Sequence, residues 1–119
     1  MITENEVSDL LGKELPEINL ELDKLSNSSN IYKAMRCFVD YTKQLILKGN
    51  INETKLCFIL AERMLIEGNN SVRNAIENVY VYSLGTFIDL ADSTANRAKE
   101  IFNGLLKKEY NRQLMASGI

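Results

Sequence analysis

The chain has 119 residues, 45% hydrophobic and 25% charged, a composition typical of one globular domain covering residues 1–119. Its formal net charge is −2, from 14 basic and 16 acidic residues, which argues against a nucleic-acid-binding protein because nothing draws the chain to phosphate. One proline and six glycines are few helix breakers, so long helices are favoured over a turn-rich β fold.

The first predicted helix begins after Thr3, because Glu6 stands three residues further on, the spacing of a capping box. The apolar face has the i, i+3, i+4 spacing that an amphipathic helix needs to dock on a core. Its residues are Val7, Leu10, Leu11 and Leu15. Pro16 ends this helix near Leu15, since proline lacks the N–H that would continue it.

Pro16 can also open a second short helix, because proline is tolerated in a first helical turn. Ile18, Leu22 and Leu25 have helical spacing, whereas Ile18, Leu20 and Leu22 alternate as in a strand. A lone strand would have no partner in this chain, so we predict a helix followed by a polar linker at residues 26–30.

The next predicted helix begins at a cap on Ser28 or Ser29 and ends near Lys48. Its apolar stripe keeps one face for more than four turns. The stripe consists of Ile31, Ala34, Met35, Phe38, Tyr41, Thr42 and Leu45. Gly49 follows, and we expect it to end the helix in the left-handed conformation.

Residues 50–92 read as an antiparallel helical hairpin around which the rest of the chain is organised. Asn50 or Asn52 caps its first helix, and Gly68 should end that helix at positive φ, as Gly49 does for the helix before. The apolar stripe consists of Leu56, Ile59, Leu60, Met64 and Leu65. Because the turn is short, the two helices should be antiparallel neighbours.

The second helix of the hairpin should be capped by Asn70 or Ser71 and cover residues 72–90. Residues 79–82 are β-branched and aromatic, so propensity alone also allows a strand. Helical spacing on both sides decides for a helix. Gly85 should either kink it or let another helix approach closely.

The last helix should start at a cap on residues 92–94 and continue to about residue 116. Its apolar stripe consists of Ala95, Ala98, Ile101, Phe102, Leu105, Leu106 and Tyr110. Lys107, Lys108 and Arg112 form the densest basic cluster; such a cluster on a helix end is usually solvated, and binding of an acidic partner is the alternative. We expect Phe38, Ile59, Leu60, Ile76 and Phe102 to be buried together.

The residues needed for catalysis are missing. The chain has no histidine, the commonest general base and metal ligand. Cys37 and Cys57 lie in apolar helical patterns and read as reduced core thiols, a disulfide being the alternative. Asp40, Glu62 and Glu77 read as solvated helix faces. We therefore expect no enzyme, no cofactor and no metal site.

The span 56–91 resembles the hairpins of small bacterial HEAT-like helical proteins. The residues that carry this resemblance are Ala61, Met64, Leu65, Gly68, Asn69, Val72, Arg73, Ala75, Ile76, Val79, Leu84 and Leu90. Several such proteins are uncharacterised, and some look like immunity proteins or adaptors. The resemblance implies an all-α fold and a binding role. The chain departs from true repeats, since it has one hairpin and a half rather than about three stacked units.

We therefore predict an all-α domain of about five or six helices that acts as a protein-interaction module, such as a bacterial adaptor or toxin-immunity protein. Tyr80, Val81 and Tyr82 are the expected contact residues for a protein partner or a homodimer, because exposed tyrosine is common at interfaces. Burial of this face under another helix is the alternative. A second function is a small-molecule sensor with a cavity under Tyr80, Tyr82 and Phe87.

The expected location is the cytoplasm. The first residues are acidic and lack the basic start and apolar run of a signal peptide. No apolar run approaches the roughly 20 residues that span a bilayer, so we expect no membrane contact.

Overall fold

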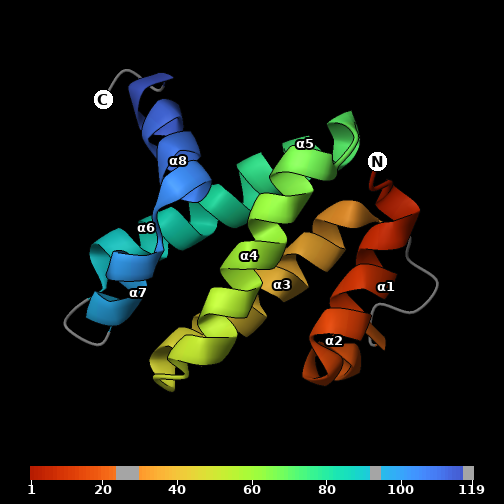
Figure 1. Ribbon diagram of the computed structural model, residues 1–119, viewed down its shortest axis with the longest axis horizontal. Coiled ribbons are helices and arrows are strands. Elements are labelled where there is room, and N and C mark those ends of the chain that lie inside the picture. Colours follow the sequence, from red (N-terminus) through yellow and green to blue (C-terminus); the bar gives the residue numbers. More distant parts are fainter. Residues whose placement is uncertain (24–29, 92–94, 117–119) are drawn as a thin grey trace.

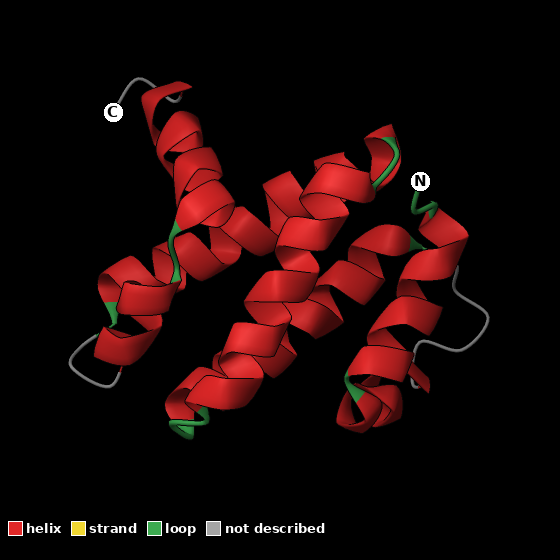
Figure 2. Cartoon of the chain, in the orientation of Figure 1, coloured by secondary structure: helices red, strands yellow, loops and turns green. Residues whose placement is uncertain are grey.

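The computed structural model describes residues 1–23, 30–91 and 95–116, and within these ranges the chain is an all-α single domain. Almost all of the residues in these ranges are helical (Figure 2). In chain order they are α1 (Glu4–Glu14), η1 (Pro16–Ile18), α2 (Asn19–Asp23), α3 (Ile31–Leu47), α4 (Ile51–Glu67), α5 (Asn70–Ala75), η2 (Ile76–Val81), α6 (Tyr82–Leu90), α7 (Asn96–Ile101) and α8 (Gly104–Ala116). The predicted fold class is confirmed.

The long helices α3 and α4 cross the middle of the molecule, with α4 in front of α3 (Figure 1). The N-terminal helices α1 and α2 lie at one end, and α6, α7 and α8 lie at the other. The rod made of α5, η2 and α6 packs against both α3 and α4. Three long helical segments, α3, α4 and α5–η2–α6, therefore form the middle of the molecule. Shorter helices pack against them at each end.

The first helix follows the sequence closely. The Glu6 carboxylate accepts hydrogen bonds from the Thr3 N–H at 3.1 Å and from the Thr3 hydroxyl at 2.8 Å, so the predicted contact between these residues is present. Leu11 and Leu15 are fully buried, and Pro16 opens the short helix η1. The strand alternative for residues 18–22 is wrong, since the chain continues as α2.

Asparagine side chains cap three of the helices, α3, α4 and α5. Asn50 caps α4 as predicted, its side chain accepting from the Glu53 N–H at 3.2 Å. Asn30 caps α3 through the Tyr32 N–H at 2.8 Å, and Asn69 caps α5 through the Val72 N–H at 2.9 Å. The expected caps Ser28 and Ser29 lie outside the described residues. The predicted caps Asn70 and Ser71 are wrong, since both already lie inside α5 and the Asn69 side chain accepts from the Val72 N–H instead.

The two glycine joints differ. Gly49 has φ +72°, the predicted left-handed helix end. The same prediction for Gly68 is wrong, because Gly68 is extended with φ −73° and ψ 152°. The physical reason is a bridge to the N-terminus: the Ile2 N–H donates to the Glu67 carbonyl at 2.7 Å, and the Asn69 N–H donates to the Ile2 carbonyl at 2.8 Å. The extended backbone at Gly68 lets Ile2 pair with this turn.

Residues 79–82 are helical as predicted, but the helix changes register. A π-helical turn, η2, separates α5 from α6. It contains Tyr80, whose ring stacks on Phe38 with centroids 4.2 Å apart. Gly85 allows the close approach that the sequence suggested, since a Cβ at this position would collide with the Tyr110 ring.

The predicted continuous last helix is wrong. The chain leaves the helical conformation at Phe102, and Gly104 has φ +59°, which separates α7 from α8. This break directs the Phe102 ring between Phe58 and Tyr110, with centroid distances of 5.5 and 6.3 Å. The interruption of the helix thus allows the Phe102 ring to pack against two other aromatic rings.

The predicted core is correct except for Ile59. Phe38, Leu60, Ile76 and Phe102 are each at most 3% exposed, whereas Ile59 is 62% exposed. The inward positions of α4 are Thr54, Cys57, Phe58, Leu60, Ala61 and Met64. These follow the i, i+3, i+4, i+7 pattern, which turns Ile59 outward because it lies opposite Cys57 and Ala61 on the helix.

Candidate functional site

The predicted contact face does not form as a surface. Tyr80 and Val81 are both fully buried, and only Tyr82 is exposed, at 51%. The reason is that η2 packs against α3, α4 and α8 at once, so the exposure expected for Val81 is wrong. Two of the three predicted residues therefore belong to the core, and a partner contact at Tyr82 stays a prediction.

The three aromatic residues of the predicted cavity, Tyr80, Tyr82 and Phe87, do not line a common pocket among the pockets described here. The Tyr80 hydroxyl lies 3.0 Å from the Thr42 hydroxyl, and burial raises the Tyr80 pKa well above its ordinary value. Phe87 is half-buried beneath the Lys43 ammonium group, 5.4 Å from the ring centroid. Neither of the two pockets described below is lined by Tyr80, Tyr82 or Phe87.

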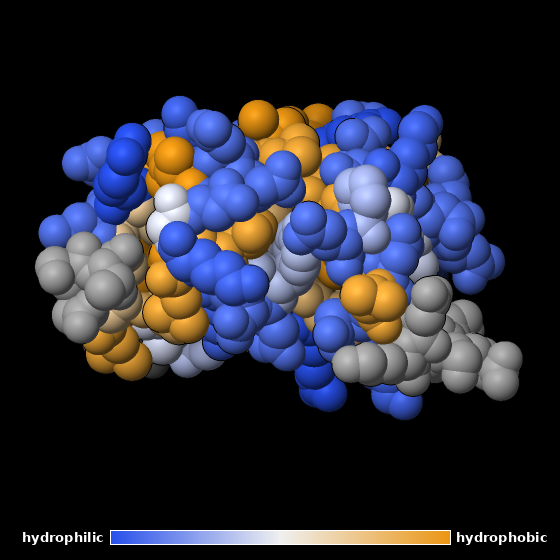
Figure 3. Space-filling model, turned by 90° about the horizontal axis from the view of Figure 1, so that it is seen from below, coloured by the Kyte–Doolittle hydropathy of each residue, from blue (hydrophilic) through white to orange (hydrophobic). Residues whose placement is uncertain are grey.

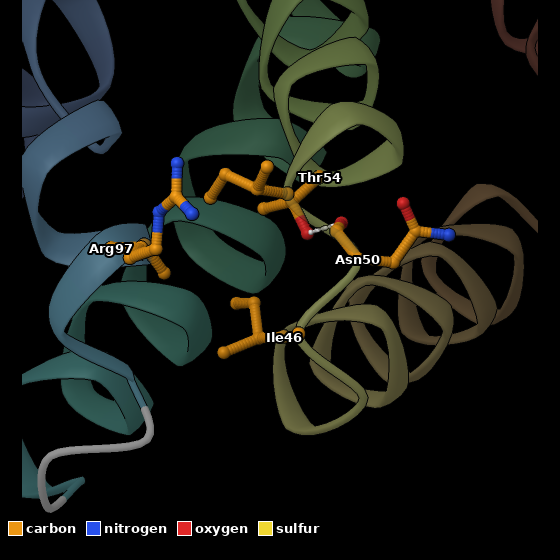
Figure 4. Close-up of a pocket in the computed structure, with 7 residues that line it drawn as sticks. Ile46, Asn50, Thr54 and Arg97 are labelled. Atoms are coloured by element: carbon orange, nitrogen blue, oxygen red, sulfur yellow. Dashed lines mark hydrogen bonds between the residues drawn. The ribbon is translucent and has the colours of Figure 1, made fainter.

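One pocket lies where the joint between α3 and α4 faces α7. Figure 4 shows Arg97 of α7 across from Thr54 of α4, with Ile46 of α3 below. The Thr54 hydroxyl donates to the Asn50 carbonyl at 2.8 Å, and the Asn50 side chain already caps α4. The pocket has a volume of about 50 Å³, well below the ~300–1,000 Å³ of drug-sized ligand sites. This pocket therefore gives little support to a metabolite sensor.

A larger hollow lies between α4 and α8, and we call it the α4–α8 groove. Its lining residues are Leu65, Ile66, Leu105, Lys108, Glu109 and Arg112, and its volume is about 320 Å³. Ile66 is 66% exposed and Leu105 is 41% exposed, so large aliphatic side chains face solvent here. Ile59 lies on the same face of α4 as Ile66, since seven residues make almost two helical turns.

The charged groups of the α4–α8 groove are partly paired. The Arg112 guanidinium donates twice to the Glu109 carboxylate, at 2.8 and 2.7 Å, and the Gln113 amide donates to it at 2.7 Å. The Arg112 hydrogen bonds lower the Glu109 pKa, so this carboxylate is ionised and satisfied. Lys108 is exposed and has no ion-pair partner among the residues that the structure describes.

Of the predicted basic cluster, only Lys108 is thus exposed without an ion-pair or aromatic partner among the described residues. Arg112 is held by Glu109, and the Lys107 ammonium lies 5.6 Å from the centroid of the Tyr110 ring. Sequence reasoning weighed these cations but missed the aliphatic residues beside them. The signal is present in α4, where Ile59 and Ile66 share one face; the predicted stripe is correct for Leu60 and Met64 and wrong for Ile59.

The part of the chain that the structure covers contains no cluster of side chains that could hold a metal ion. No group of three or more Cys, Asp or Glu side chains that could hold a metal occurs in residues 1–23, 30–91 and 95–116. Cys37 and Cys57 are not joined in a disulfide, and burial raises the pKa of Cys57 to about 12, which makes it unreactive. Within the same ranges, none of the helices is both long and apolar enough to cross a membrane.

Comparison with known proteins gives a match to one protein family. Neither the curated proteins nor the solved structures contain a match to this chain. The family described as "Domain of unknown function (DUF7674)" matches residues 8–116, which includes every helix except the first residues of α1. The chain therefore belongs to the DUF7674 family.

Proposed function

We propose that this protein is a non-enzymatic interaction module that docks a partner protein in the α4–α8 groove. The observation that carries the proposal is the exposure of Ile66 and Leu105 side by side in a hollow bordered by Lys108. Exposed aliphatic residues that gather beside polar ones are typical of protein-docking surfaces, whereas single exposed ones are ordinary.

The form of the α4–α8 groove favours a protein over a small ligand. The hollow is open to solvent, whereas small-molecule sites usually enclose most of their ligand. Ile59 extends the aliphatic face along α4 beyond the groove, a reach that suits a helix or loop of a partner. The sensor alternative lacks comparable support, since Tyr80 is packed by Phe38 rather than open to a ligand.

Narrower roles follow only from the resemblance of residues 56–91 to bacterial HEAT-like hairpins, which favours an adaptor or a toxin-immunity protein. A cytoplasmic location fits two cysteines that are not joined in a disulfide, because disulfides are rare in that compartment.

A photo-crosslinking amino acid placed at a single position tests the proposal. We expect a crosslinker at Ile66 to capture a protein in source cells, because its side chain projects at the groove. A crosslinker at Tyr82, with comparable exposure of 51%, is the matched control on another face. Capture at Tyr82 alone would move the docking surface to the α6 face. Capture at neither position, with both variants folded, would contradict an interaction module of this kind.

A further inference from the structure

The charges of this molecule are divided between its two ends. Residues 1–23 contain seven acidic residues and one basic residue, a formal charge of −6. Residues 95–116, which form α7 and α8, contain five basic and two acidic residues, a formal charge of +3. These segments lie at opposite ends of the molecule (Figure 1). The protein is therefore strongly dipolar although its net charge is only −2.

The acidic end also carries an exposed aliphatic side chain. Leu20 of α2 is 74% exposed, and the exposed residues Glu17 and Glu21 stand close to it in the chain. In the space-filling view, a small hydrophobic area at this end adjoins hydrophilic residues (Figure 3). An exposed leucine beside the Glu17 carboxylate is complementary to a surface that has an apolar hollow beside a cation.

The α4–α8 groove, between the central helix α4 and the basic helix α8, has that combination. Leu65, Ile66 and Leu105 supply the apolar surface, and Lys108 supplies a cation that no described carboxylate pairs. Glu109 does not repel an incoming carboxylate strongly, because Arg112 and Gln113 already neutralise and satisfy it. The groove therefore suits an aliphatic side chain that arrives with an acidic neighbour.

We propose that the occupant of the α4–α8 groove is a second copy of this chain, which inserts Leu20 and sets Glu17 against Lys108. The inference rests on the proposed function, since it names the partner of the same groove. The two surfaces are different, so the contact is heterologous: copies add head to tail, and each open assembly keeps a free groove and a free Leu20 at its ends. One leucine and a few charges make a small interface, which places the affinity in the weak, salt-sensitive class.

Sedimentation equilibrium of the full chain gives the first test. At low salt, the weight-average mass should rise above 13.5 kDa as concentration increases, without stopping at a dimer. At about 0.5 M salt it should fall back toward the monomer mass, because the Debye length is then short. A mass of 13.5 kDa at every concentration and salt would overturn the proposal.

Complementation gives the second test, which separates a head-to-tail contact from a symmetric dimer. Leu20→Asp removes the inserted side chain, and Leu105→Asp spoils the groove; Lys108→Glu replaces Leu105→Asp if that variant does not fold. Each variant alone should stay monomeric, whereas an equimolar mixture should form a one-to-one pair and nothing larger. Leu90→Asp is the matched control at an 82% exposed leucine, and it should assemble like the natural sequence.

Association of either variant alone, or failure of the mixture to pair, would also overturn the proposal. A symmetric dimer of the natural chain would do so as well. If the chain stays monomeric while a crosslinker at Ile66 captures a different protein, the second copy is refuted and the docking function stands. If neither occurs, both are refuted.

Discussion

The hydroxyl of Tyr80 lies 3.0 Å from the hydroxyl of Thr42 in the centre of the molecule, with both side chains fully buried. The Thr42 hydroxyl donates to the Phe38 carbonyl at 2.8 Å, so Tyr80 supplies the hydrogen of the shared contact. The π-helical turn η2 carries Tyr80 to this position and stacks its ring on Phe38. The register change thus satisfies a buried hydroxyl that would otherwise cost free energy.

This contact predicts unequal effects of removing its two partners. Tyr80→Phe should lower the free energy of unfolding by about 1 kcal/mol, because only one hydrogen bond is lost. Thr42→Val should cost more, about 1–3 kcal/mol, because it leaves the Tyr80 hydroxyl buried without a partner. Denaturant unfolding of both variants and of the double variant measures this. The double variant should cost less than the sum, and strict additivity would show that the hydroxyls do not interact.

The glycine joints predict a second contrast. Gly49→Asn should be tolerated, because asparagine adopts positive φ and the space around Gly49 is open. Gly68→Ala should destabilise the fold by more than about 1 kcal/mol, since its Cβ would collide with the Met64 carbonyl oxygen and the Val72 side chain. Thermal melts compare the two variants. Equal melting temperatures for Gly68→Ala and the natural chain would mean that this turn relaxes freely.

Much of the fold up to α4 follows from local sequence rules. Thr3, Pro16, Gly49 and Asn50 occupy the positions that capping and turn chemistry assign to them. Gly68 was misjudged because its conformation depends on Ile2, sixty-six residues earlier in the chain. A backbone bridge between such distant segments leaves no local signal, so only the folded chain reveals it.

The orientation of α4 was ambiguous for a different reason. Residues 56–61 are apolar without interruption, so more than one stripe fits the helical period. Packing decides between them: Phe58 meets Phe102, and Ile59 is left outside. The candidate groove was missed through this choice, because one of its neighbouring residues was assigned to the core.

A third prediction follows from that orientation. Phe102→Ala should lower the free energy of unfolding by about 3–5 kcal/mol, because a ring packed against Phe58 and Tyr110 is replaced by a cavity. Ile59→Ala should change it by less than about 0.5 kcal/mol, as expected for an exposed position. Urea denaturation followed by circular dichroism measures both. A large loss for Ile59→Ala would return Ile59 to the core.

The break between α7 and α8 could have been found in the sequence. Asn103 and Gly104 form an Asn-Gly pair, a strong turn signal, inside an otherwise periodic helix. The π-helical turn has no such signature, and it changes the direction in which the residues inside it and after it point. Val81 is buried for this reason, although a regular helical wheel places it away from the inward stripe.

The opposite pKa shifts of Glu77 and Glu109 predict opposite effects of pH. Burial raises the Glu77 pKa, with Glu109 adding repulsion against the attraction of Arg112 and Arg73, so ionised Glu77 destabilises the fold above its ordinary pKa. Glu77→Gln should therefore increase stability near pH 7 and match the natural chain near pH 3. Hydrogen bonds from Arg112 and Gln113 lower the Glu109 pKa, so the stability it contributes is present above its ordinary pKa and is lost as pH falls.

Glu109→Gln should accordingly lose stability near pH 7, with the difference shrinking toward pH 3. Chemical denaturation across this pH range measures both variants. Differences that do not change with pH would show that packing, rather than ionisation, sets the effect of each substitution.

The last prediction separates the two neighbours Val81 and Tyr82, which the sequence placed together on a contact face. Val81→Asp should unfold the monomer, because it buries an unpaired carboxylate where η2 meets α3, α4 and α8. Tyr82→Asp should leave the fold intact, because the Tyr82 side chain is 51% exposed. Circular dichroism and sedimentation decide the matter. If Tyr82→Asp keeps the helical spectrum and still assembles head-to-tail, the α6 face takes no part in that contact. If it unfolds the chain, Tyr82 belongs to the core with Tyr80, and the exposed face of α6 must be redrawn.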